Sequence, residues 1–451
     1  MKIFLIAPCV PCRDHGTRGI EAVHIIVYHL LAYLQEQGNE LALQVVYART
    51  PHDPVEVAAF TAGLEHLKSR GVTVFDPLSV DRVGAAPAAD KGKFARLLDL
   101  VRGRVGLERY YPSVGLTSVL KERITRHAPD IIYMHCSPEG VAATYDLEGI
   151  PKITFQGDID FIPTKVRFEH PEFFMRSSEV TGGLASLPVM LAHHIKQRLL
   201  LAEFESAHLA TMAAVDVIAN NAANNALYYS RHGHPRSVYI RNPWKRPPAA
   251  WSSQRAPTQP PGSRQVKIIG HMGNLATTGS TFGLRYLLKE VMPELERSMR
   301  DFDYKVYVIG AGRIADRLKP LLHHPRVVTP GFVADLDAEV IDSDVVLFLN
   351  NAGPYQTAFT RHMVTWSLGG CLIVSDKSRI AIPEIRHRYN ALCGSAPAEI
   401  ADLVREAVTD QTLNRSLREQ GLATYEEYFT PEAVATALYK EMGAVVKKAV
   451  Q

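Results

Sequence analysis

The chain has few cysteines, little net charge and no long apolar run, and each shortage excludes a class of protein. Only five of its 451 residues are cysteine, at positions 9, 12, 136, 371 and 393, and they form no disulfide framework. Lys and Arg (50) nearly balance Asp and Glu (47), and no basic tract typical of nucleic-acid binding occurs. The net charge of +3 is compatible with anionic substrates or a membrane surface. No segment approaches the roughly 18 uncharged apolar residues of a membrane span.

The first residues form a short apolar run that could be mistaken for a signal peptide. Charged residues at 13–18 follow directly, which favours a buried first strand and a cytoplasmic protein. Cys9 and Cys12 have the spacing of a redox site or half a zinc site. No second pair completes a tetrahedral site, so we interpret them as two thiols at the end of a strand.

Length and composition favour a globular protein of two domains, because 451 residues exceed one ordinary core. Residues 243–265 are rich in Pro, Ser and Gln and predict a linker. We therefore expect a first domain over 1–242 and a second over 266–429. Thr430 as N-cap and Pro431 at the first helical position predict a terminal helix over 430–451, which completes the first domain.

Both expected domains alternate strands with helices, which is typical of an α/β fold with doubly wound parallel sheets. Such sheets bind ligands at the carboxyl ends of their strands. The expected strands are Lys2–Ala7, Leu41–Tyr47, Asp130–Met134, Pro151–Phe155, Val215–Ala219, Val266–Gly270, Lys305–Gly310, Arg326–Thr329, Val345–Asn350 and Cys371–Ser375. The expected helices include Gly19–Gln37, Thr281–Arg300, Ala311–Leu322 and Arg361–Leu368.

The order of segments from Gly331 to Gly394 runs strand, small-residue loop, helix, Gly369-Gly370, strand and Pro383-Glu384. This order resembles the donor-binding half of GT-B glycosyltransferases, the large retaining family known as glycosyl transferases group 1. The resemblance implies two Rossmann-like domains that face a central cleft. It also implies transfer of a sugar from a nucleotide-diphosphate donor to a hydroxyl of a small-molecule, glycan or lipid-linked acceptor, with no cofactor and no bound metal.

The same resemblance implies donor contacts in the loops between strands and helices. Glycine in such loops lets the backbone approach a ligand closely, although a plain turn explains Gly19 without any ligand. The implied contacts to the phosphates and the base are Gly19, Gly273, Asn274, Gly310, Phe332 and Val333.

The central loop departs from the family pattern. Where many relatives carry one glutamate near the sugar and another on the ribose hydroxyls, this chain has Gln356 and Val364. Arg361 falls where relatives place a lysine, and a guanidinium there would suit a diphosphate, although it could also cap a surface helix. Thr357 and Thr360 can donate hydroxyls to phosphate at the start of the same helix.

Three residues of the first domain are candidates for catalysis. His135 ends a strand that resembles the family's strand with a terminal histidine, although a lone histidine is often structural. Gln156 and Asp158 stand where the family often carries a histidine that faces the transferred sugar. Both can hydrogen-bond sugar hydroxyls, and Asp158 could assist acceptor deprotonation. With Asp160 nearby a metal pair is conceivable, but the resemblance argues against it.

Two alternatives stay open at this point. The missing glutamates also fit a sugar-nucleotide-binding protein that has lost catalysis, and the fold would serve a nucleotide-sugar epimerase. The acceptor cannot be read. Residues 163–208 mix aromatic, basic and apolar side chains, which suits either a peripheral contact with the inner membrane face or an ordinary helical subdomain.

Overall fold

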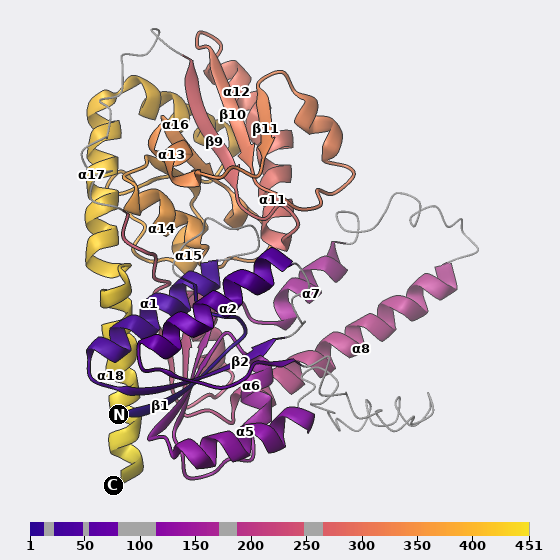
Figure 1. Ribbon diagram of the computed structural model, residues 1–451. Coiled ribbons are helices and arrows are strands. Elements are labelled where there is room, and N and C mark those ends of the chain that lie inside the picture. The colour runs from indigo at the N-terminus through magenta and orange to yellow at the C-terminus, as the bar shows by residue number, and fades with distance from the viewer. Residues whose placement is uncertain (13–21, 48–53, 80–113, 171–186, 248–264, 451) are drawn as a thin grey trace.

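A computed structural model describes the chain apart from residues 13–21, 48–53, 80–113, 171–186, 248–264 and 451. The described residues build two parallel sheets, one in each half of the chain, with helices against them (Figure 1). The α/β class with two doubly wound Rossmann-like sheets is therefore confirmed.

The first sheet has the strand order β3-β2-β1-β5-β6-β7-β8, with β4 paired to β2, and all these pairs are parallel. The strand order reverses between the neighbouring strands β1 and β5, so the topological switch point lies at their carboxyl ends. Both β5 and β6 are buried along their whole length, as expected for strands covered on both faces. The strands are β1 (Lys2–Ala7), β2 (Glu40–Tyr47), β3 (Thr73–Val74), β4 (Leu78–Ser79), β5 (Ile131–His135), β6 (Lys152–Gln156), β7 (Val217–Asn220) and β8 (Ser237–Tyr239).

Helices cover both faces of this sheet, and each face has its own apolar cluster. Val27 and Leu31 of α1 belong to one cluster, and Leu120 of α5 and Phe161 of α7 belong to the other. The long helix α8 extends away from the sheet (Figure 1). The helices are α1 (Ala22–Glu36), α2 (Pro54–Ser69), α5 (Val114–His127), α6 (Pro138–Ala143), α7 (Phe161–Glu169), α8 (Leu187–Met212) and α9 (Ala223–Arg231).

The second sheet has the order β11-β10-β9-β12-β13-β14, again with all pairs parallel. Its switch point lies between β9 and β12. The strands are β9 (Val266–Met272), β10 (Tyr304–Ile309), β11 (Val327–Gly331), β12 (Val345–Phe348), β13 (Leu372–Ser375) and β14 (Leu392–Gly394). Its helices are α11 (Thr278–Tyr286), α12 (Met292–Ser298), α13 (Leu336–Ile341), α14 (Thr360–Ser367), α15 (Ser378–Ala381), α16 (Pro397–Thr409) and α17 (Gln411–Tyr428). The π-helical segment η4 (Leu287–Val291) links α11 to α12, and η5 (Lys319–His323) and η6 (Asn350–Ala352) are short 3₁₀ segments.

One expected helix of this half is wrong. Residues 311–322 were expected to be helical, but the structure has turns there and then the short 3₁₀ segment η5. Gly310 and Gly312 adopt φ values of 143° and 119°, which no right-handed helix contains. Pro320 also lacks the backbone donor that a helix over 311–322 would need near its end. Apolar spacing alone did not reveal these breaks.

The terminal helix α18 (Pro431–Val450) joins the two halves. Thr430 Oγ1 accepts a hydrogen bond from Ala433 N at 3.2 Å, so the predicted N-cap is confirmed. Val434 and Leu438 are buried in the same cluster as α1 of the first half. Helices α17 and α18 therefore run along one side of both sheets (Figure 1).

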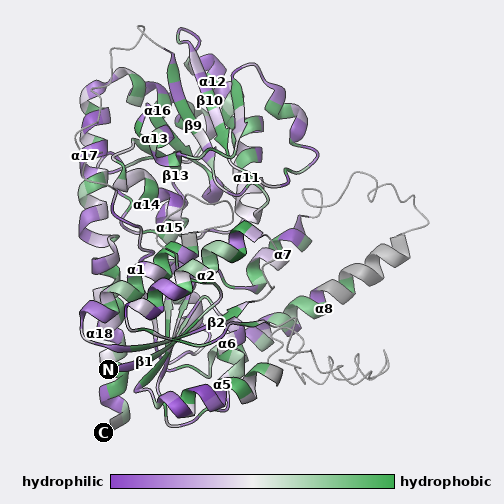
Figure 2. Cartoon of the chain, in the orientation of Figure 1, coloured by the Kyte–Doolittle hydropathy of each residue, from purple (hydrophilic) through white to green (hydrophobic). Residues whose placement is uncertain are grey.

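Hydropathy follows this architecture. Figure 2 shows the strands of the first sheet as mainly hydrophobic, whereas α17 is hydrophilic over much of its length. Among the helices that the structure describes, none is both long and apolar enough to cross a membrane.

Candidate active site

The carboxyl ends of the two sheets meet at one junction. Thr357, which follows β12, donates from Oγ1 to Asp158 Oδ1, which follows β6, at 2.5 Å. Asn224 Nδ2 donates to the backbone oxygen of Gln356 at 3.0 Å. Arg167 Nε of α7 donates to Thr278 Oγ1 of α11 at 3.0 Å. Because ligands bind parallel sheets at these ends, the junction is the candidate active site.

Arg361, near the start of α14, is the strongest candidate for binding an anion. Its guanidinium lies over the rings of Phe348 and Phe359, 5.5 and 5.7 Å from their centroids. Nη2 also donates to Ser280 Oγ at 3.4 Å. Burial lowers the pKa of Arg361 to about 10, and no carboxylate in the described part of the chain offsets this. Enclosing a cation without a negative partner is costly, so a negatively charged ligand would be stabilised here.

Neutral polar groups surround the guanidinium at the switch point of the second sheet. With its amide turned to satisfy its neighbours, Asn350 Oδ1 accepts from Arg361 Nη1 at 2.9 Å and from Ser280 N at 3.3 Å. Burial lowers the pKa of His271 well below its usual value, with a smaller contribution from Arg361. Burial also lowers the pKa of His362 to about 4. Both imidazoles are therefore neutral near pH 7, and Arg361 keeps its charge unopposed.

Two glycines let the loops close around Arg361. Gly273 and Gly310 adopt φ values of 104° and 143°, where a residue with a side chain would be strained. A Cβ on Gly310 would lie 1.8 Å from the backbone oxygen of Gly273, and a Cβ on Gly273 would lie 2.9 Å from Arg361 Nε. The backbone thus approaches the guanidinium as closely as only glycine permits. Asn274 is turned to its own loop, where Oδ1 accepts from Ala276 N at 2.9 Å.

The opposite side of the junction carries carboxylates. Asp158 keeps contact with solvent, yet the protein atoms around it raise its pKa by desolvation. The hydrogen bond from Thr357 lowers that pKa in part, and nearby Asp160 raises it. Gln156 is buried at the end of β6, where its Nε2 donates to Thr154 Oγ1 at 2.7 Å. Of the predicted catalytic residues, the structure thus brings Asp158 into contact with the second half.

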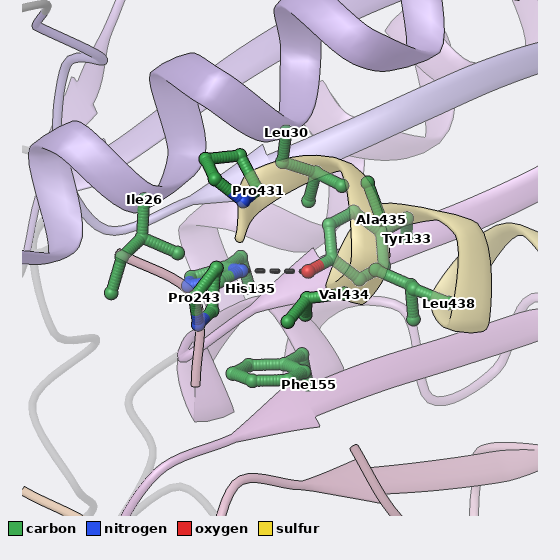
Figure 3. Close-up of a pocket in the computed structure, with 10 residues that line it drawn as sticks. All are labelled: Ile26, Leu30, Tyr133, His135, Phe155, Pro243, Pro431, Val434, Ala435 and Leu438. Carbon is green, nitrogen blue, oxygen red and sulfur yellow. Dashed lines mark hydrogen bonds between the residues drawn. The ribbon is translucent and has the colours of Figure 1, made fainter. Parts of the chain in front are cut away.

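His135 lies in a different environment from Asp158. It lines a cavity of about 10 Å³ between β5, β6, α1 and the start of α18, together with Pro243 and Pro431 (Figure 3). Tyr133 OH lies 2.6 Å from His135 Nδ1, and the ring of Phe155 stacks on the imidazole at 5.0 Å. Burial lowers the pKa of His135 to about 3. The ring is neutral and packed, and it takes no part in the contacts between Asp158 and Thr357.

The remaining predicted contacts are dispersed. Phe332 is 54% exposed beyond β11, and Val333 packs against the core of the second half. Thr360 Oγ1 accepts a hydrogen bond from Asn242 Nδ2 at 3.0 Å, so it faces the first half. Val364 is buried in the apolar core, and its side chain has no group that could hydrogen-bond a ribose. Gly19 lies outside the described residues.

Sequence reasoning missed several polar residues of the junction. Asn350 lies two residues after the end of β12, and His271 is a polar residue inside the apolar strand β9. Glu384 accepts from Arg241 Nε at 2.5 Å and from Tyr239 OH at 2.9 Å, which ties the two halves together. A polar residue at the end of, or within, a buried strand is the signal that could have found the first two.

Comparison with known proteins agrees with this geometry. Residues 266–410, which include Arg361 and both glycine loops, match the family described as Glycosyl transferases group 1. This part of the chain is similar to group 1 glycosyltransferases. Within the matched residues, Gln356 and Val364 stand where the family pattern expects glutamates.

Solved glycosyltransferase structures share their fold with this chain over nearly its full length. The α,α-trehalose 6-phosphate synthase of Burkholderia multivorans superposes with a TM-score of 0.61 at 13% identity, covering 100% of this chain and 98% of that one. HepE of Anabaena, solved with UDP and glucose, gives 0.58 at 12% identity, covering 98% and 100%. Sucrose-phosphate synthase of Thermosynechococcus elongatus gives 0.57 at 13% identity, also covering 98% and 100%. No curated protein sequence matches the chain.

Proposed function

We propose that this protein is a glycosyltransferase that moves a sugar from a nucleotide-diphosphate donor to an acceptor hydroxyl with retention of anomeric configuration. It would act in the cytoplasm, in the biosynthesis of a polysaccharide, glycolipid or glycosylated metabolite. The observation that carries the proposal is Arg361, a partly buried cation with no carboxylate partner among the described residues, at the switch point of the second sheet. HepE was solved with UDP and glucose, which supports the same class of donor here.

The donor diphosphate is proposed to bind between Arg361 and the start of α11. Thr277 Oγ1 accepts from Ser280 N at 3.2 Å and so caps that helix. The backbone N–H groups of its first turn and the helix dipole favour an anion at this end. The exposed ring of Phe332 offers a surface for the nucleotide base.

In the proposed reaction, the acceptor oxygen forms a bond to the anomeric carbon while the bond from that carbon to the diphosphate oxygen breaks. The electron pair of the broken bond leaves with the nucleoside diphosphate, and Arg361 stabilises this charge. The acceptor proton passes to Asp158 or to a diphosphate oxygen on the same face. The raised pKa of Asp158 makes its carboxylate a stronger base than an ordinary aspartate.

The two missing glutamates change donor recognition more than they change the phosphate site. Gln356 Nε2 donates to the backbone oxygen of Gly353 at 3.1 Å, and Val364 is buried in the core. No acid from these two positions offsets Arg361, so the donor side stays electropositive. Recognition of the ribose must therefore use other groups.

A screen of nucleotide sugars by thermal shift, followed by mass spectrometry of the products, tests the proposal. We expect one nucleotide sugar to raise the unfolding temperature and to be consumed only when an acceptor is present. Binding without turnover under any acceptor would instead indicate a sugar-nucleotide-binding protein. Conversion of the donor to an epimer without acceptor would indicate an epimerase. If no nucleotide sugar or nucleoside diphosphate binds, the donor site is wrong.

A further inference from the structure

Asn350 lies two residues after the end of β12, and the second half encloses it closely. The residue is 2% exposed. A Cβ on Gly283 would lie 2.9 Å from Asn350 Cα, and one on Gly279 would lie 3.7 Å from its amide group. These two glycines are four residues apart on α11 and so share one face of that helix. They therefore leave the space that the Asn350 side chain fills.

The surroundings fix which way the amide of Asn350 faces. Two N–H donors, Arg361 Nη1 at 2.9 Å and Ser280 N at 3.3 Å, approach the same side of the amide, so its oxygen belongs on that side. The amide also hydrogen-bonds the imidazole of His271 on β9. The reverse orientation would set the NH₂ group against two donors. Asn350 Oδ1 is thus held as an acceptor for Arg361.

The contacts that hold the guanidinium of Arg361 carry no negative charge. Besides its bond to Asn350, the guanidinium donates from Nη2 to Ser280 Oγ at 3.4 Å. The rings of Phe348 and Phe359 lie against it, with centroids at 5.5 and 5.7 Å. Among the described residues, these hydrogen bonds use two of the five N–H donors of a guanidinium. Arg361 is only half-buried, so an anion can reach the remaining donors.

An amide at position 350 differs from a carboxylate in one respect that matters for anion binding. Asparagine and aspartate have nearly the same shape, and both would place an oxygen near Arg361 Nη1. A carboxylate would form a charge-assisted pair and cancel the positive charge. The amide oxygen orients the guanidinium and leaves its charge in place. The residue at 350 therefore decides both the orientation of Arg361 and the charge that it presents.

We propose that Asn350 is a positioning residue, which holds Arg361 toward the donor diphosphate through an uncharged oxygen. This role in the reaction rests on the proposed function, whereas the contact between Asn350 and Arg361 does not. Asn350 itself touches no substrate and acts through Arg361. A carboxylate in its place should convert the anion site into an internal ion pair.

The test is Asn350→Asp, measured in the full chain by two independent readouts. Isothermal titration calorimetry with inorganic pyrophosphate reports anion binding without a nucleoside or a sugar. We expect the affinity for pyrophosphate to fall at least about tenfold, because the anion would meet a carboxylate beside a neutralised cation. The unfolding temperature without ligand should stay the same or rise, because the enclosed cation gains a partner.

Two further variants distinguish positioning from a purely structural role. Asn350→Ala removes the oxygen without adding charge, so it should weaken pyrophosphate binding less than Asn350→Asp and should lower the unfolding temperature. In an Arg361→Met background, Asn350→Asp should also lower the unfolding temperature, because its carboxylate is then enclosed without a partner. This dependence on Arg361 is the signature of the proposed contact.

Asn414→Asp is the matched control, because the chain also holds a buried Asn-Arg pair away from the junction. Arg418 Nε donates to Asn414 Oδ1 at 2.6 Å on α17, and Asn414 is 1% exposed. The variant changes the net charge by the same amount and also places a carboxylate beside an arginine. Its affinity for pyrophosphate should change less than about twofold, because a distant charge is screened.

Three results would overturn the proposal. One is that Asn350→Asp binds pyrophosphate as tightly as the wild type. Another is that Asn350→Asp lowers the unfolding temperature equally with and without Arg361, which would make Asn350 purely structural. The third is an equal loss of affinity in Asn350→Asp and Asn414→Asp, which would assign the loss to net charge.

Failure of this proposal and failure of the donor site are distinguishable. If the wild-type chain does not bind pyrophosphate, the proposed diphosphate site is wrong, and the role of Asn350 is wrong with it. If the wild type and all variants bind pyrophosphate alike, the role of Asn350 is wrong and the anion site stands.

Discussion

The two sides of the junction differ in charge. The side from the second sheet has the cation Arg361 among the neutral imidazoles of His271 and His362. The side from the first sheet has the carboxylates of Asp158 and Asp160 and the uncharged amides of Asn221 and Asn224. Glycosyl transfer needs this division, because negative charge develops on the leaving diphosphate while the acceptor hydroxyl loses a proton. Each side of the junction suits one of these partners.

The largest effect is expected from Arg361→Met. Loss of a preorganised cation at a developing negative charge should lower kcat/KM by on the order of 10³-fold. The unfolding temperature of the ligand-free protein should stay the same or rise, because an unpaired, partly buried cation is removed. Steady-state kinetics and thermal unfolding check both expectations.

Arg285→Met serves as the control for Arg361, because Arg285 lies in the same half and pairs with Glu290 at 2.9 Å. It should change kcat/KM by less than about tenfold. If Arg361→Met kept its affinity for nucleoside diphosphate, the diphosphate would bind elsewhere. Arg361 would then no longer mark the second-sheet side of the junction as the donor side.

The acidic side is tested by Asp158→Asn, which should lower kcat by on the order of 10²-fold. A proton acceptor must be ionised, so wild-type activity should fall as the pH drops through the pKa of Asp158. Because that pKa is raised, the fall should occur above the usual carboxylate range. The pH profile of kcat checks this, and the acidic limb should be absent in Asp158→Asn.

The variant Thr357→Val further tests whether Asp158 causes the acidic limb of the pH profile. The hydrogen bond from Thr357 lowers the pKa of Asp158, so its removal should move the acidic limb to higher pH. A limb that does not move in Thr357→Val, or that persists in Asp158→Asn, would assign it to another group.

A stability effect confined to the electropositive side is expected from Gly283→Ala. The new Cβ would lie 2.9 Å from Asn350 Cα and 3.0 Å from Asn350 N, so α11 would have to shift. Overpacking of this kind costs about 1–3 kcal/mol of unfolding free energy. Gly443→Ala on α18 meets nothing within 4 Å and should instead stabilise by about 0.5–1 kcal/mol. Urea unfolding distinguishes the two, and equal effects would contradict the packing around Asn350.

The smallest effect is expected from Glu384→Gln at the contact between the halves. The variant weakens two hydrogen bonds to a largely buried carboxylate, and we expect a loss of about 1.5 kcal/mol. Glu406→Gln weakens the half-exposed pair with Arg388 and should cost at most about 0.5 kcal/mol. If both variants unfold alike, Glu384 does not hold the halves together.

Strand positions and the order of segments were predictable because buried parallel strands are continuous apolar runs. The spacing of Val345–Asn350 and Cys371–Ser375 sufficed to find β12 and β13 and, with Gly369-Gly370, the family. The environment of His135 was not predictable. It depends on α18, which packs there from the far end of the chain, and local sequence carries no signal of such a contact.

The asparagines at the end of β7 and the start of α9, Asn220, Asn221, Asn224 and Asn225, illustrate another limit of sequence reasoning. Their amides attract no attention as isolated residues, since asparagine is common in turns. Their meaning depends on which amide atoms find partners, and this depends on β6 and on Gln356 of the second half. Arg361 was found because its place in the family pattern was informative. Its lack of a carboxylate partner among the described residues emerged only in three dimensions.

The chain crosses between its two halves twice, near Trp244 and near Phe429, and hydrogen bonds hold the two crossing segments together. Trp244 N donates to the backbone oxygen of Phe429 at 3.0 Å, and Tyr425 OH donates to the backbone oxygen of Trp244 at 2.9 Å. Because the two crossings lie side by side, they act as a hinge. The halves can rotate about this hinge but cannot separate by translation. Pro243 and Pro431 stiffen the two crossings beside the small cavity at His135. Entry and exit of substrates would thus depend on a single angle.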